Sequence, residues 1–321
     1  MKKLIILTVC LGAAIFAKAQ QPEMAKAIVR YKFSHIRDTT QRDKPYTENM
    51  VLFLGETSSA YKSFDRKTQE ALMRQQLAQQ MAEQKASGGR MDFKLTSRKP
   101  VTRTELYQFP TINKFVRKDN LITPYLIEET MPVIKWKITA DTATIGTLHC
   151  QKATGHFKGR DYTAWFSPDL PFRVGPWKLN GLPGLIVEAY DTNKEVEFKF
   201  DGIEQVKPVD PKAVAAQESA APASGPTTVI KFSSDDDNKN PNLIALPTNA
   251  VKTTEKEFTK LQEAMRKDPQ AFMAAMGGNN VGNVVVSGRP TGGAGQINSV
   301  SVNMTGKPDA INNPIELPEK K

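Results

Sequence analysis

One cysteine with histidines nearby is the combination in this sequence that could perform nucleophilic catalysis. Cys150 directly follows His149, and His156 comes six residues later. A histidine that accepts the thiol proton produces a thiolate, which is the attacking group of cysteine hydrolases. Successive side chains of a strand point to opposite faces, so His149 cannot contact Cys150 if this segment is a strand. We expect a buried structural cysteine, with a Cys-dependent periplasmic hydrolase as the alternative.

Acidic and histidine side chains form no pattern that predicts a metal site. The chain has three histidines, His35, His149 and His156. They lack the spacing of a zinc-binding helix, and neither a Cys-x-x-Cys pair nor a calcium loop is present. The acidic run at residues 235–237 is better explained as a solvated turn than as a calcium site. Glu128 and Glu129 keep a carboxylate-dependent hydrolase open, but we assign no catalytic residue, metal or cofactor.

Aromatic and apolar side chains gather in one segment that has no catalytic group beside it. Side chains of this kind line pockets for small molecules and peptides. We predict that they border a groove for an apolar ligand, a lipidated chain or a protein partner, although they could instead pack as an ordinary core turn. The candidate residues are Trp165, Phe166, Phe172, Trp177, Leu182 and Pro183.

A proline and two glycines predict a tight turn at the end of this segment. Pro183 fixes φ and Gly184 can adopt a positive φ, which suits the two central positions of a type II turn. Gly181 would allow the close approach of another backbone. The apolar residues of this turn, which we expect to be packed, are Leu182, Leu185 and Ile186.

The elements that must position this segment are mainly strands, because polar and apolar residues alternate in short runs separated by turn residues. We expect residues 27–33 and 49–55 to pair, and two hairpins to turn at residues 157–160 and 191–194. Residues 141–146 are predicted as a turn or short cap. The predicted strands cover residues 27–33, 49–55, 133–138, 147–154, 161–166, 185–190 and 195–200.

Two segments have helical composition. Residues 65–85 are expected to form a helix that stops at residues 87–89, with a stripe that includes Leu72 facing the core. Residues 253–276 place Phe258 and other apolar residues on one side. We therefore predict an α+β fold: a mainly antiparallel curved β-sheet, one or two packed helices and a disordered C-terminal tail.

The chain is expected to divide into five parts. They are a signal peptide at residues 1–19, a β-rich domain at 20–207, a flexible Pro/Ala/Ser and acidic insertion at 208–242, a helical segment packed on the domain at 243–276 and a Gly/Asn-rich tail at 277–321. Within the tail, residues 312–317 are expected to form a last short ordered segment.

The N-terminus resembles an export signal. Lys2 and Lys3 precede an apolar run at residues 4–16, and Ala17-Lys18-Ala19 provides a small-x-small cleavage site. The run is shorter than the ~20 residues of a membrane-spanning helix, so we expect cleavage after Ala19 and no transmembrane span. The alternative is lipidation of Cys10, which the bulky residue before it disfavours.

Composition narrows the class of partner. The formal net charge is +10, and three of the positive residues lie in the signal. The remaining positive residues are interleaved with acidic residues through most of the chain. This distribution of charge, together with export, argues against a nucleic-acid partner. After cleavage Cys150 is the only cysteine, so stability must come from packing.

The segment at residues 162–168 and the hexapeptide Gly181-Leu182-Pro183-Gly184-Leu185-Ile186 resemble the GLPGLI family, exported proteins of Bacteroidetes-type bacteria that are named for this hexapeptide. Cys150-x-Lys152-Ala153-Thr154 and residues 313–317 are similar to further family features. The resemblance implies an envelope location and a mainly antiparallel sheet, but no reaction. We expect a non-catalytic binding module, with a hydrolase and a structural scaffold of an envelope assembly as alternatives; the sequence does not predict the oligomeric state.

Overall fold

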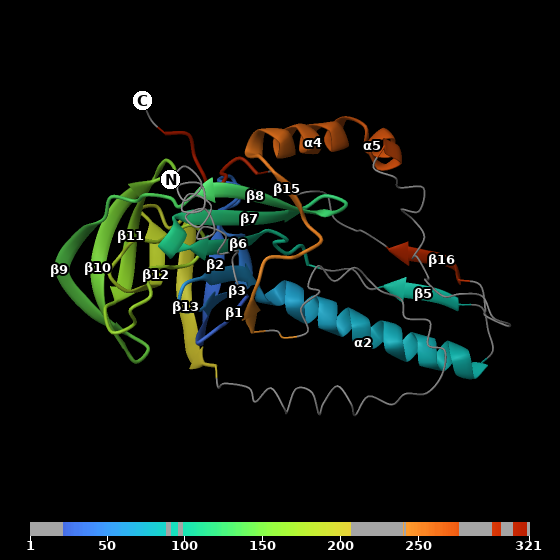
Figure 1. Ribbon diagram of the computed structural model, residues 1–321, viewed down its shortest axis with the longest axis horizontal. Coiled ribbons are helices and arrows are strands. Elements are labelled where there is room, and N and C mark those ends of the chain that lie inside the picture. The colour runs from blue at the N-terminus through green and yellow to red at the C-terminus, as the bar shows by residue number, and fades with distance from the viewer. Residues whose placement is uncertain are drawn as a thin grey trace, which may run out of the picture.

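A strongly curved sheet of twelve strands makes up most of the structure (Figure 1). The computed structural model describes residues 22–87, 91–95, 99–206, 240, 242–275, 297–302 and 311–319. From edge to edge, the strands are β15 (Val251–Thr253), β8 (Pro124–Thr130), β7 (Lys114–Asn120), β6 (Glu105–Phe109), β4 (Ser59–Ser63), β3 (Tyr46–Leu54), β2 (Ala27–His35), β13 (Val196–Gln205), β12 (Leu185–Asp191), β11 (Arg160–Ser167), β10 (Leu148–Phe157) and β9 (Lys137–Ile145). All neighbours are antiparallel except β15 and β8.

The first long strand, β2, lies in the middle of the sheet and joins its two halves. On one side it pairs with β3, where Ala27 lies opposite Leu54 and His35 opposite Tyr46. On the other side it pairs with β13, where His35 lies opposite Val196. Strand β2 therefore joins one half, built from β3, β4, β6, β7, β8 and β15, to another half, built from β9 to β13.

Helices and two small sheets lie around this large sheet. The remaining elements are β1 (Glu23–Met24), α2 (Phe64–Ser87), β5 (Met91–Leu95), the 3-10 turn η2 (Pro110–Ile112), β14 (Leu243–Ile244), α4 (Glu255–Lys267), α5 (Pro269–Ala275) and β16 (Ile297–Val302). Strands β1 and β14 pair antiparallel, and β5 and β16 pair parallel. Helix α4 begins with a capping box between Thr254 and Glu257 and packs Phe258 on Tyr125 of β8. Figure 1 shows α2 extending away from the large sheet.

The alternation of side chains divides the core into two layers. Tyr31 of β2 belongs to a large cluster on the inner face, and Ile28 belongs to a smaller one on the outer face. Phe115 of β7 and Phe166 of β11 share the inner cluster although their strands are not neighbours. The sheet therefore curves around a common core. Ile244 of β14 packs in the outer cluster.

The predicted fold class is confirmed: the structure is α+β with a mainly antiparallel curved sheet. The pair formed by residues 27–33 and 49–55 is confirmed as β2 and β3. Both hairpins are confirmed, as β10 with β11 and as β12 with β13. The helix expected at residues 65–85 corresponds to α2. Residues 253–276 form two helices instead of one, with a break at Asp268 and Pro269, because proline removes a backbone donor and suits the first turn of a new helix.

Three local predictions are wrong. Residues 133–136 precede β9, and the side chain of Val133 is 85% exposed. Residues 141–145 are strand instead of turn, and the chain turns after them at Gly146, whose φ is +62°. Strand β9 is an exposed edge, so it lacks the apolar alternation that marks half-buried strands. Leu72 of α2 is 54% exposed, whereas Leu77 further along the helix is buried, so the buried side of α2 is not the predicted stripe.

Several expected features lie outside the described residues. These are the signal at residues 1–19 with Cys10, most of the insertion with its acidic run at 235–237, and residues 276–296 and 303–310 of the tail. The ordered segment expected near the C-terminus is present, because residues 311–319 contact the sheet through Asn312, Asn313 and Leu317. None of the described helices is both long enough and apolar enough to cross a bilayer.

Candidate functional site

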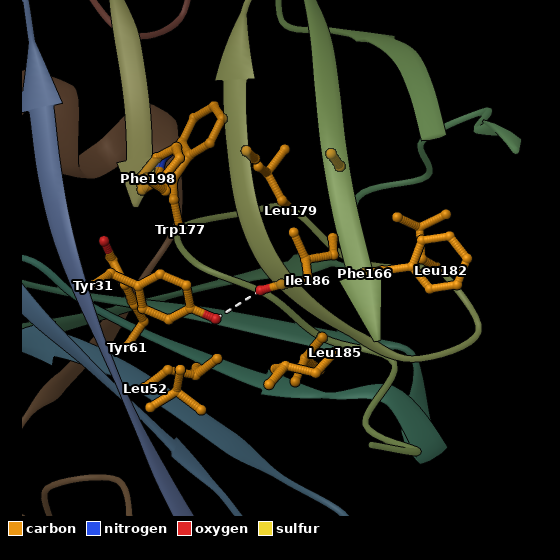
Figure 2. Packing of buried hydrophobic residues seen from close by; sticks show 14 of the residues in the cluster. Tyr31, Leu52, Tyr61, Phe166, Trp177, Leu179, Leu182, Leu185, Ile186 and Phe198 are labelled. Carbon is orange, nitrogen blue, oxygen red and sulfur yellow. Dashed lines mark hydrogen bonds between the residues drawn. The ribbon is translucent and has the colours of Figure 1, made fainter. Parts of the chain in front are cut away.

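Residues 168–184, which we call the core loop, fill the inside of the curved sheet. The loop buries Val174, Trp177, Leu179 and Leu182 in the inner cluster. Its backbone bonds to the start of β12, since the amide of Leu185 donates to the carbonyl oxygen of Leu170 at 2.9 Å. Figure 2 shows these apolar side chains around β12.

The hexapeptide is anchored to the central strand of the sheet. The hydroxyl of Tyr31 in β2 donates to the carbonyl oxygen of Ile186 at 2.7 Å, drawn as the dashed line in Figure 2. Leu182, Leu185 and Ile186 are each at most 1% exposed. The apolar residues of the hexapeptide are therefore packed, as expected.

The two glycines of the hexapeptide have roles opposite to those that we predicted. Gly181 has a φ of +93°, whereas Gly184 is not among the residues with positive φ, so the predicted type II turn is wrong. A Cβ on Gly184 would lie 2.7 Å from the carbonyl carbon of Ser167. Gly184 therefore allows close backbone approach, because β11 ends directly beside it, and Gly181 provides the left-handed backbone conformation.

The predicted candidate residues do not line one common groove. Phe166 and Leu182 are fully enclosed, and Phe172 is partly buried against the inner cluster. Pro183 is exposed. Trp165 lies half-buried on the opposite face of β11, between Lys152 and Glu188 of the neighbouring strands. Of the predicted candidates, Trp177 alone lines the cavity of about 260 Å³ described next.

We call this cavity the Trp177 pocket. Its volume is about 260 Å³. Its lining combines aromatic and aliphatic side chains with charged and hydroxyl side chains from the segments after β2 and before β6, from β7, from the core loop and from the C-terminal segment. The lining residues are Phe33, His35, Arg37, Met50, Tyr61, Thr102, Thr104, Leu106, Arg117, Trp177, Lys178, Phe198, Ile315 and Glu316.

Trp177 has a backbone conformation that is unusual for a bulky residue. Its φ is +55°, in the left-handed region that favours glycine. Its indole ring stacks on Phe198 with centroids 6.4 Å apart and planes 13° apart. The side-chain amide of Gln108 donates to the carbonyl oxygen of Trp177 at 3.2 Å. Packing therefore holds a strained residue at the wall of the pocket.

Most charges at the pocket are already paired. Lys178 lies 2.7 Å from Glu316, and Arg117 lies 2.7 Å from Asp119. Arg37 differs, because its guanidinium stacks on Tyr46 and no carboxylate of the described chain lies within ion-pair distance.

Two polar side chains of the lining are buried without a complete set of partners. His35 is 4% exposed and Tyr61 is 5% exposed. The Nε2 atom of His35 and the hydroxyl of Tyr61 have no hydrogen-bond partner among the described residues. Burial, together with the positive charges of Arg160 and Arg37, lowers the pKa of His35 to about 4. His35 is therefore neutral at pH 7, and its Nε2 atom and the Tyr61 hydroxyl are enclosed by the protein.

A second cavity, of about 440 Å³, lies beside the start of α2. Its charges form a network around Glu105, which lies 3.3 Å from Lys62 and 3.4 Å from Arg66, while the fully buried Lys118 lies at 3.1 Å. Burial opposes the charge on Glu105, but these cations together with a bond from Tyr107 lower its pKa to about 2. These ion pairs connect the start of α2 to β4, β6 and β7, and no aromatic side chain of the described chain lines this cavity.

The structure does not assemble the predicted alternatives for catalysis. Cys150 is 3% exposed, and burial raises the pKa of its thiol to about 11. His149 is exposed on the other face, and His156 is bound to Asp161 and Glu319 at the far end of β10, ~20 Å along the strand. Glu128 pairs with Lys114. No cluster of three or more His, Cys, Asp or Glu suited to a metal occurs in the part of the chain that the structure describes.

Sequence reasoning missed Arg37, His35 and Tyr61 as pocket residues. One signal was available: the alternation of Tyr31, Phe33 and His35 continues along β2, which places the histidine on the buried face. No comparable signal links Arg37 or Tyr61 to Trp177, because they lie more than a hundred residues apart in sequence.

Known proteins match parts of this chain. No curated protein matches the sequence significantly. Two solved structures of PNGF-II are similar to this chain. The structure in space group P21 has a TM-score of 0.40 and 13% identity, over 59% of this chain and 30% of that chain. The structure in space group C2 has a TM-score of 0.44 and 11% identity, over 73% of this chain and 32% of that chain. This chain thus spans about a third of their length. Residues 157–188, which contain the hexapeptide, match a family described as a protein of unknown function, Porph_ging.

Proposed function

We propose that this protein is an exported, non-catalytic binding module of the cell envelope, and that it binds one small apolar group in the Trp177 pocket. An apolar cavity of ~150 Å³ is large enough for benzene. A pocket of about 260 Å³ has room for a substituted ring or a branched side chain. Phe33, Trp177 and Phe198 provide aromatic walls for such a group.

The strained backbone of Trp177 is the observation that carries this proposal. A bulky residue in the left-handed region costs ~1–3 kcal/mol, and such residues cluster at binding and catalytic sites. A core that needed only to be filled could do so with unstrained residues. The strain instead occurs at a residue that lines a cavity. The signal-like N-terminus supports export.

Ligand-detected NMR with 3-phenylpropan-1-ol, which carries one ring and no charge, tests the proposal. We expect saturation transfer from the wild-type protein to the ring protons. Trp177→Ala should weaken binding, because it removes one wall of the pocket. Met50→Phe should also weaken binding by filling the cavity, and it keeps Trp177 in place if the first variant folds poorly.

Trp165→Ala is the matched control, since Trp165 lies on the outer face of the same sheet half. It should leave binding unchanged. Thermal unfolding of each variant shows whether the fold is retained. The proposal fails if the folded wild-type protein binds no ring compound, or if Met50→Phe and Trp165→Ala affect binding equally.

A further inference from the structure

The Trp177 pocket contains one cation that is not neutralised. Arg117 is held by Asp119 at 2.7 Å and by Glu255 at 2.6 Å. Lys178 is held by Glu316 at 2.7 Å. Arg37 has no carboxylate partner in the described chain, so it is the lining cation that is available to a ligand.

Arg37 is also held in a fixed position. Its guanidinium carbon lies 3.3 Å from the centroid of the Tyr46 ring. Its backbone carbonyl oxygen accepts from the amides of Asn312 at 3.1 Å and Asn313 at 3.0 Å. Stacking and backbone anchoring reduce the conformational entropy that a guanidinium loses when it binds an anion.

The acidic side chain of the lining does not compete for Arg37. Glu316 is the one carboxylate among the described lining residues, and it is engaged by Lys178 and by Lys158 at 3.2 Å. The half-buried position of Arg37 reduces its hydration. A carboxylate would bind such a guanidinium through two parallel hydrogen bonds.

We infer that the ligand of the Trp177 pocket is a small organic acid, in which one aromatic or branched apolar group enters the pocket and a carboxylate binds the guanidinium of Arg37. This inference rests on the proposed function, because it assigns the charge of the group that the pocket binds.

Titration calorimetry at pH 7 with three probes of one shape tests the inference: 3-phenylpropanoate, 3-phenylpropan-1-ol and 3-phenylpropylammonium. For wild-type protein we expect the acid to bind about tenfold more tightly than the alcohol, since a hydrogen bond to a charged group contributes about that factor. The ammonium compound should bind most weakly. Arg37→Gln should reduce the affinity for the acid to that for the alcohol, and should leave the alcohol unchanged.

Arg30→Gln is the matched control, because Arg30 lies on β2 in an exposed pair with Glu204 and does not line the pocket. It should keep the preference for the acid. If wild-type protein binds acid and alcohol equally, or if Arg37→Gln keeps the preference, the inference is wrong while the proposed function stands. If none of the three probes binds, the proposed function fails, and the inference fails with it.

Discussion

The guanidinium of Arg160 lies 2.6 Å from the carboxylate of Asp191, and both side chains are almost fully buried, at 2% and 4% exposed. This pair joins the start of β11 to the end of β12. The same guanidinium donates to the side-chain oxygen of Asn313 at 2.6 Å and to the carbonyl oxygen of Pro314 at 2.8 Å. One buried cation therefore ties the C-terminal segment, which borders the Trp177 pocket, to the sheet.

We expect Arg160→Met to destabilise the protein by about 3–5 kcal/mol, because it leaves the buried carboxylate of Asp191 without its cation. Urea unfolding at neutral pH measures the change. Lys26→Met is the control. It removes an ion pair with Glu56 in which both side chains are more than half exposed, so its effect should stay below about 1 kcal/mol. Equal effects of the two variants would contradict the role given to Arg160.

The two hexapeptide glycines should respond differently to the same substitution. Gly184→Ala places a methyl group against the backbone of Ser167, which cannot move without displacing the end of β11. We expect a loss of about 3 kcal/mol or failure to fold. Gly181→Ala meets only the ring of Trp136, at a van der Waals distance of 4.0 Å, so only its positive φ is costly, at about 1–2 kcal/mol. Thermal unfolding compares them, and a larger effect at Gly181 would refute this assignment of roles.

His35 should make stability depend on pH in a defined range. Its folded pKa of about 4 is below the ordinary value of 6.5, so between these values the unfolded chain binds a proton that the folded protein does not. Stability should therefore fall as the pH decreases through 6.5 toward 4. Between pH 7.5 and pH 5 the loss from His35 should be about 2 kcal/mol.

His35→Gln removes this titration and isolates it from the other groups. The variant should lose about 2 kcal/mol less than wild type over the same pH interval in urea unfolding experiments. His156 is present in both proteins, so its raised pKa cancels in the comparison. Parallel pH profiles for the two proteins would show that His35 titrates normally.

The parts of the fold that could be predicted from sequence are those that local patterns specify. The hairpin between β10 and β11 was predictable because Lys158-Gly159 is a turn signal between two strand-like runs, and both residues have positive φ in the structure. The alternation of Val196, Phe198 and Phe200 identified β13 because one face of that strand is buried. Strand β9 was missed because neither of its faces is buried.

The candidate site was only partly predictable, because long-range contacts build it. Aromatic composition identified Trp177, but the same argument selected Phe166 and Trp165, which lie inside the core and on the outer face. Whether an aromatic side chain fills a core or borders a cavity depends on the curvature of the sheet. Nothing in the sequence indicated that the guanidinium of Arg160 would be buried among five hydrogen-bond partners, since an arginine in a hairpin is normally exposed.

The thiol of Cys150 should be unreactive in the folded protein, which separates the binding module from the Cys-dependent hydrolase. The thiol is buried and its pKa is raised to about 11, because desolvation disfavours the thiolate. At pH 7.5 we expect iodoacetamide to label the peptide that contains Cys150 at least ~100-fold more slowly in native protein than in urea. The thiolate is the reactive form, and its fraction falls tenfold for each unit by which the pKa rises. Mass spectrometry of the digested protein quantifies this site alone. Fast labelling of Cys150 in the native state, at a rate like that in urea, would instead indicate an accessible and activated thiolate and would favour the hydrolase.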